Sequence, residues 1–151
     1  MNIYGKRLGE YFDVMKTPIV LLIALSIVQF VVRIIAYFMK QNIIRILGWI
    51  VFAVIETIWV IMLLYLSWIA VRHRKWSSMN LLFTGLVFGL IGGLITSTNL
   101  IFGNIVAVVL SESWGVFKAV VWSGITIVFL PLLKCILGGF ISGVIGVVFE
   151  D

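Results

Sequence analysis

Apolar residues fall into four long runs that are separated by short charged or polar segments. The runs cover residues 18–39, 46–71, 81–110 and 116–149. A bilayer core of about 30 Å needs roughly 20 apolar residues in a helix, so each run is long enough to cross a membrane. The pattern predicts an all-α, polytopic transmembrane bundle of four spans that forms a single integral membrane domain over residues 1–151.

The third and fourth runs are too long to cross a bilayer as straight, upright helices. At about 1.5 Å per residue they exceed the hydrocarbon thickness, so they must tilt, protrude or break. A polar cluster, Thr96 to Asn99, interrupts the third run, and Pro131 removes a helix hydrogen bond in the fourth. We expect kinks near these two places. Five or six shorter segments are the alternative, but no fragment makes a comfortable full span alone.

The segment before the first run, residues 1–17, has a helical pattern of its own. Tyr4, Leu8, Tyr11, Phe12 and Met15 recur at helical spacing, and charged residues occupy the rest of the turn. This pattern predicts a short amphipathic helix in the headgroup plane, serving as a surface anchor or as a docking surface for a cytoplasmic partner. The first run itself is longer than a signal-peptide core and lacks a cleavage site, so we expect a retained span.

Basic residues are distributed unequally between the two sides that four spans define. One side would carry six of them, namely Lys6, Arg7, Lys16, Arg72, Arg74 and Lys75. The other side would carry three, namely Lys40, Arg45 and Lys118. Because cytoplasmic loops are enriched in Lys and Arg, both termini are predicted to be cytoplasmic. Trp68 and Trp76 near one face, and Trp49 and Trp114 near the other, fit interfacial aromatic belts.

Composition strengthens the membrane assignment. The chain is 63% hydrophobic and 11% charged, whereas soluble domains are about 45–50% apolar. The net charge of +5 is better explained by topology and by anionic lipid headgroups at the basic loops than by nucleic acid, which we do not expect as a partner. A single cysteine, Cys135, excludes an internal disulfide framework.

Three charged residues lie at membrane depth: Arg33 in the first run, Glu56 in the second and Lys134 in the fourth. Each is costly there, by about 2.5–3.5 kcal/mol on insertion scales, and therefore needs a reason. Arg33 also continues a polar stripe with Ser26, Gln29 and Tyr37, which should face protein.

These charges have three interpretations. In the structural one, Arg33 pairs with Glu56 and joins the first two helices, while Lys134 snorkels or bonds carbonyls freed by Pro131. In the functional one, the charges line a pathway for an anion, a proton or a lipid headgroup. In the third, a charge pairs with a helix of another subunit.

Glycine is concentrated in the second half of the chain. Only Gly5, Gly9 and Gly48 precede residue 81, so eleven of the fourteen glycines follow it. The spacing of six small or polar residues in the third run puts them on one helix face: Gly85, Gly89, Gly92, Thr96, Asn99 and Gly103. Three more follow in the fourth run: Gly139, Gly143 and Gly146. Small faces allow close helix contact, so we expect the third and fourth helices to pack together, or one face to pair with another subunit.

The residue types of catalysis are scarce. His73 is the only histidine and lies in a basic loop, and no two carboxylates share a span. We therefore expect no enzyme activity, no metal and no cofactor. The sequence favours a structural or accessory subunit of a homo-oligomer or larger membrane complex. The alternative is a small transporter, channel or lipid flippase built around Arg33, Glu56 and Lys134.

Overall fold

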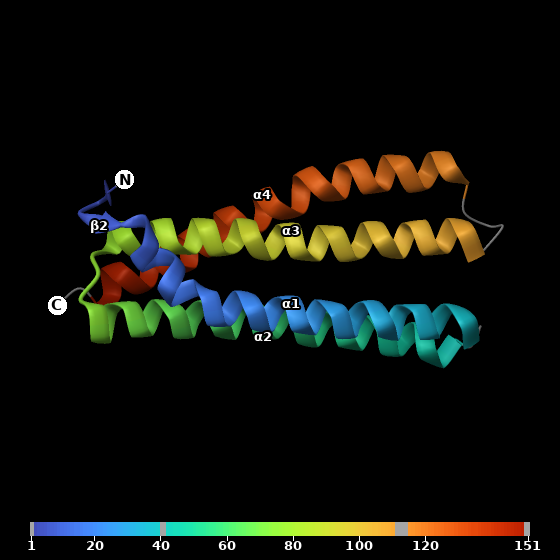
Figure 1. The fold of residues 1–151 in the computed structure, drawn as a ribbon, viewed down its shortest axis with the longest axis horizontal. Helices are drawn as coiled ribbons and strands as arrows, with labels where there is room; N and C mark the ends of the chain where they lie inside the picture. The colour runs from blue at the N-terminus through green and yellow to red at the C-terminus, as the bar shows by residue number, and fades with distance from the viewer. Residues whose placement is uncertain (1, 40–41, 111–114, 150–151) are drawn as a thin grey trace.

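Four long helices, preceded by a short hairpin, make up the computed structural model of the chain (Figure 1). The helices are α1 (Leu8–Met39), α2 (Asn42–Arg74), α3 (Ser78–Leu110) and α4 (Val116–Phe149). The structure describes residues 2–39, 42–110 and 115–149. Lys40, Trp114 and the side chains of Tyr37 and Arg45, which have predicted roles, lie outside this description.

All four helices are long and apolar enough to cross a membrane. The prediction of an all-helical protein with four helices of spanning length is therefore confirmed. Helices α1, α2 and α3 extend beyond the apolar runs, whereas α4 has the bounds of the fourth run. In α2, charged residues such as Arg72 and Arg74 continue the last turn. The segment 96–99 lies within the uninterrupted α3, and Pro131 lies within α4. Kinks at these two places stay a prediction.

The first residues form an antiparallel hairpin of β1 (Asn2–Ile3) and β2 (Lys6–Arg7). The two residues between the strands, Tyr4 and Gly5, have φ angles of 49° and 80°. Positive φ at both central positions is what a type I′ hairpin turn requires. Helix α1 starts directly after β2, where the Glu10 carboxylate accepts a hydrogen bond from the Arg7 backbone N–H at 3.1 Å.

The segment 1–17 thus differs from the separate helix that was expected. Residues 2–7 form the hairpin, and the residues from Leu8 onward are the first turns of the uninterrupted α1. A sequence pattern at helical spacing cannot distinguish a short helix from the extension of a longer one. The position of these turns in the headgroup plane stays a prediction.

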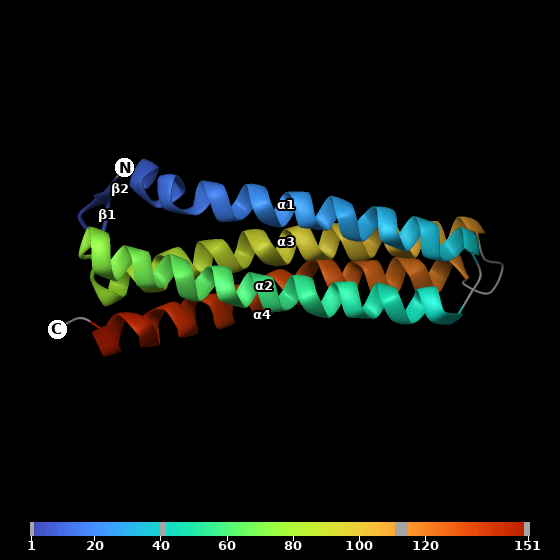
Figure 2. The same ribbon diagram turned by 90° about the horizontal axis from the view of Figure 1, so that it is seen from below.

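The helices run back and forth along one long axis (Figures 1 and 2). The hairpin, the turn between α2 and α3 and the end of α4 all lie at one end of the bundle, which we call the hairpin end. Helix α4 packs mainly on α3 and crosses it, while α1 packs on both α2 and α3. Helix α3 is therefore the central element, with neighbours on several sides.

Buried apolar side chains gather toward the hairpin end. The cluster includes Tyr11, Met15, Leu63, Trp76 and Phe88, each at most 3% exposed. Most apolar side chains on the outer surface of α4 are instead exposed, up to 80% at Phe117. Such a surface fits contact with lipid tails or with another transmembrane helix.

Candidate functional site

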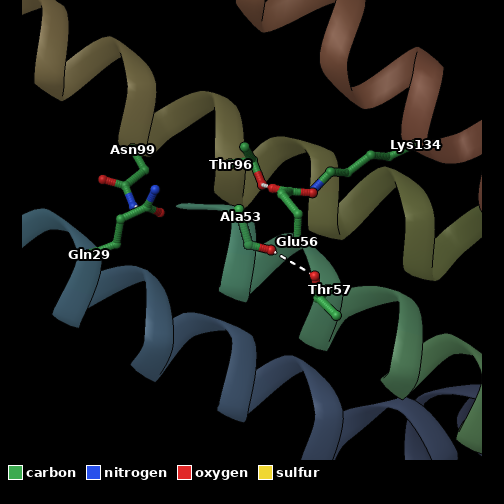
Figure 3. A network of polar contacts seen from close by, with 7 residues as sticks. All are labelled: Gln29, Ala53, Glu56, Thr57, Thr96, Asn99 and Lys134. Atoms are coloured by element: carbon green, nitrogen blue, oxygen red, sulfur yellow. Dashed lines mark hydrogen bonds and ion pairs between the residues drawn. The ribbon is translucent and has the colours of Figure 1, made fainter. Parts of the chain in front are cut away.

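An ion pair links α4 to α2 in the middle of the bundle (Figure 3). The Lys134 ammonium lies 2.6 Å from Oε2 of Glu56 and also donates to Oε1 at 2.8 Å. Thr96 of α3 completes the group, because its hydroxyl accepts from Lys134 at 2.8 Å and donates to Glu56 Oε1 at 3.2 Å. Three helices thus meet in one closed set of polar contacts.

The two charges of this pair are unequally buried. The Lys134 side chain is 8% exposed, and that of Glu56 is 26% exposed. The ammonium also lies 4.9 Å from the ring centre of Trp59, which adds a cation–π contact. Trp59 is in turn stacked parallel to Phe88, with ring centres 6.4 Å apart. The buried cation is therefore held by a counter-ion, a hydroxyl and an aromatic face.

A second polar group joins α1 to α3 through Asn99. Its Nδ2 donates to Gln29 Oε1 at 2.7 Å and to the Ser26 carbonyl at 3.0 Å. Because a carbonyl oxygen can only accept, this contact fixes the orientation of the Asn99 amide and, through it, that of Gln29. Arg33 extends the group, since its Nη1 donates to the Asn99 backbone carbonyl at 3.4 Å.

The cavity between these groups is small. It has a volume of about 10 Å³ and lies among Ser26, Gln29, Trp59, Thr96 and Lys134. A space of this size holds about one water molecule, so a hydrated ion or a lipid headgroup does not fit. The Nε2 of Gln29 and the Nε1 of Trp59 are buried and have no hydrogen-bond partner among the described residues.

The structure brings together Glu56 and Lys134, two of the three charges that the sequence singled out. The structure differs from the interpretation that pairs Glu56 with Arg33. Among the described residues, the ion-pair partner of Glu56 is Lys134. Lys134 also points into the bundle instead of snorkelling outward. The reason is the close approach of α4 to α3, where the Lys134 carbonyl lies against Gly89.

The side chains of Ser26, Gln29 and Arg33 in the polar stripe all face α3, through their contacts with Asn99. The stripe was expected to face protein because lipid offers no hydrogen bonds to polar side chains. The side chain of Tyr37, its fourth member, lies outside the described residues.

Glycine residues occupy the crossing of α3 and α4. A methyl group on Gly85 would collide with the carbonyl oxygen of Gly138, and one on Gly89 would collide with that of Lys134. Gly93 has the same relation to Pro131, because an added methyl would meet its Cα. The backbones are thus so close that only a hydrogen atom fits at these positions.

The other small residues of α3 face different neighbours. Gly92 lies against the indole of Trp59, and Gly103 lies against the guanidinium of Arg33, where an added methyl would be 2.7 Å from Nη1. The single small face that the sequence indicates is therefore divided between α4 on one side and α1 and α2 on the other. In α4, the remaining predicted glycines face α3: Gly139 is near Leu86, Gly143 near Leu82 and Gly146 near Ser78.

Sequence reasoning missed Gly93, Gly138 and Trp59. A signal for Gly93 was present, because Gly85, Gly89 and Gly93 repeat at intervals of four, the spacing of close helix pairs in membranes. Trp59 carried no such signal, since an aromatic residue in an apolar run is ordinary core. Its contact with Lys134 depends on how the helices are arranged.

Within residues 2–39, 42–110 and 115–149, no group of three His, Cys, Asp or Glu side chains is placed to hold a metal ion. Comparison with known proteins gives no match to a family model, a curated protein or a solved structure.

Proposed function

We propose that this protein is a non-enzymatic, multi-pass membrane protein that acts as a structural or accessory subunit of a homo-oligomer or a larger membrane complex. The observation that carries this proposal is the closed contact of Lys134, Glu56 and Thr96 beside a cavity of about 10 Å³. Charges that neutralise one another in a nearly filled interior hold helices together. A transport pathway would instead need them to line a space wide enough for its substrate.

The first half of α4 supports an assembly role. Its apolar side chains, such as Phe117, Val120 and Trp122, are each more than half exposed. Gly124, in the same segment, has no atom within 4 Å of the position where a side chain would begin. A small residue on an apolar surface lets a second transmembrane helix approach closely. We propose this half of α4 as the surface that contacts another copy or another subunit.

We further propose that both termini are cytoplasmic. Four spans place the chain ends on the same side of the membrane, and the hairpin end carries Lys6, Arg7, Arg72, Arg74 and Lys75. Single cysteines at Lys16 and at Lys118, introduced with C135S, would test this with a membrane-impermeant thiol reagent in intact cells. The proposal expects labelling at Lys118 only.

The test of the assembly role is the native mass of the tagged protein, extracted with its own lipids into nanodiscs. We expect a defined homo-oligomer or a complex with fixed partner chains, and a shift to smaller mass in G124W. G143A is the matched control, because an added methyl there would make only an ordinary contact, 3.5 Å from Leu82. A monomeric wild type without partners would contradict the proposal.

A flux measurement addresses the transport alternative. Vesicles with purified protein are loaded with a pH-sensitive or a chloride-sensitive dye, and wild type is compared with E56Q and with empty vesicles. The proposal expects equal leak in all three. Flux in the wild type that E56Q abolishes would favour a transporter or channel.

A further inference from the structure

A cavity of about 540 Å³ is lined by residues around the turn between α2 and α3 and does not include Lys134, Glu56 or Thr96. Its walls come from the last turns of α2, the turn that follows and Phe149 at the end of α4.

The turn between α2 and α3 sets the shape of the cavity. Lys75 has a φ of 49°, a left-handed conformation that is uncommon for residues other than glycine. The backbone N–H groups of Lys75 and Trp76 then donate to the carbonyls of Val71 and Ala70, each at 3.2 Å. This reversal leaves Arg72 and Lys75 exposed at the cavity, while Trp76 turns inward and is 3% exposed.

The polar groups at this cavity are hydrogen-bond donors. Arg72 and Lys75 bring two cations. Trp76 contributes its ring to the wall, while its indole nitrogen is itself buried. Ser77 accepts a hydrogen bond from Asn80 Nδ2 at 3.0 Å, so its own O–H is left to donate. Two cations and a hydroxyl donor form a set that suits an anion with several acceptor oxygens, as a phosphate group has.

The acidic residues near this end have other partners or lie outside the description. Asp13 pairs with Lys16 at 3.3 Å, and Glu10 accepts from the Arg7 backbone. Glu150 and Asp151 follow Phe149 and are outside the described residues. The described lining therefore carries net positive charge.

We propose that this cavity binds a phosphate group, with Arg72 and Lys75 pairing with its charge and the Ser77 hydroxyl completing its contacts. Trp68, Val71 and Phe149 supply apolar walls beside these donors, and such walls suit the glycerol and upper acyl carbons of an anionic phospholipid. A soluble phosphate ester has the same head chemistry but gains nothing from the apolar walls.

The test is lipid retention by the full-length protein in native mass spectrometry. Phosphatidylglycerol, phosphatidylcholine and, separately, inorganic phosphate are titrated against wild type and against R72Q/K75Q. The control K6Q/R7Q removes two cations from the same end of the protein but outside the cavity lining. All three proteins are checked for equal melting temperature, since Arg7, Arg72 and Lys75 are exposed and Lys6 is half-buried.

We expect wild type and K6Q/R7Q to retain phosphatidylglycerol about tenfold better than R72Q/K75Q does, the loss that follows from removing charge-assisted contacts. Inorganic phosphate should compete only weakly. Strong competition by inorganic phosphate, with the same dependence on Arg72 and Lys75, would keep the phosphate site but assign it to a soluble ligand. Equal retention by R72Q/K75Q and K6Q/R7Q would overturn the proposal, because the attraction would then be general surface charge.

Discussion

Lys134 and Glu56 are 78 residues apart in sequence, yet their charged groups are 2.6 Å apart between α4 and α2. Lys134 is the more buried partner, with 8% of its side chain exposed against 26% for Glu56. Removing Glu56 and removing Lys134 should therefore destabilise the protein to different extents.

The first prediction follows from this inequality. Glu56→Gln leaves a buried ammonium without its counter-ion, and we expect a loss of about 3–5 kcal/mol in the free energy of unfolding. Lys134→Met leaves a carboxylate that keeps the hydrogen bond from the Thr96 hydroxyl, so the loss should be smaller. The measurement is unfolding in bicelles by increasing SDS.

The double variant E56Q/K134M provides the control. It removes both charges, and we expect its stability to lie closer to wild type than that of E56Q, because no unpaired charge remains. If E56Q were as stable as wild type, the ion pair would contribute nothing to holding α2 and α4 together.

The second prediction concerns the crossing of α3 and α4. G85A and G89A each push a methyl group into a carbonyl oxygen of α4, which the backbone cannot avoid without separating the helices. We expect each to reduce the free energy of unfolding by about 1–3 kcal/mol.

G124A is the matched control, since nothing lies within 4 Å of the added methyl in the described structure. Ala is favoured over Gly inside a helix by up to about 1 kcal/mol, so G124A should be neutral or stabilising. Equal destabilisation by G85A and G124A would mean that the effect does not come from this crossing.

The helices themselves were readable from the sequence for a physical reason. In lipid, backbone groups must bond within the segment, so a long apolar run has little alternative to a helix. The hairpin was not readable, because its turn needs positive φ at Tyr4, and aromatic residues give no signal for that conformation.

The site was readable in its members but not in its pairing. Charges at membrane depth identify Arg33, Glu56 and Lys134 from sequence alone. Whether Glu56 forms its ion pair with Arg33 or with Lys134 depends on which helices pack against α2 and on how close their backbones come. That is decided by the Gly85, Gly89 and Gly93 contacts, which sequence spacing indicates but does not assign to a neighbour.

The third prediction compares two adjacent residues of α3. Asn99→Ala removes the hydrogen bonds to Ser26 and Gln29 and leaves the buried Gln29 side chain without its Asn99 partner. Polar contacts between transmembrane helices contribute about 0.6 kcal/mol on average and up to about 1.7, so a loss near the upper value is expected.

Thr98→Ala serves as the comparison. The Thr98 side chain is exposed, and its hydroxyl donates to the Leu94 carbonyl of its own helix at 2.8 Å. Its stability should stay within about 0.5 kcal/mol of wild type. Identical values for the two variants would show that Asn99 does not link α1 to α3.

The fourth prediction concerns the attachment of the N-terminal hairpin. The Tyr11 hydroxyl contacts the Ile3 carbonyl at 2.8 Å and also donates to Oδ1 of Asn80 at the start of α3. Tyr11→Phe keeps the ring packing against Trp76 and removes only these contacts. We expect amide exchange in residues 2–7 to become faster, with little change in the middle of α3, because the hairpin loses its link to the bundle while the helices keep theirs.

Tyr65→Phe is the reference variant, because the Tyr65 side chain belongs to α2 and is 57% exposed. Hydrogen exchange followed by mass spectrometry resolves the two regions in one experiment. If exchange in residues 2–7 is unchanged by Tyr11→Phe, the hairpin is held by the β1–β2 pairing and ring contacts alone. Faster exchange throughout α3 would instead mean that the contact between Tyr11 and Asn80 stabilises the whole bundle and not only the hairpin.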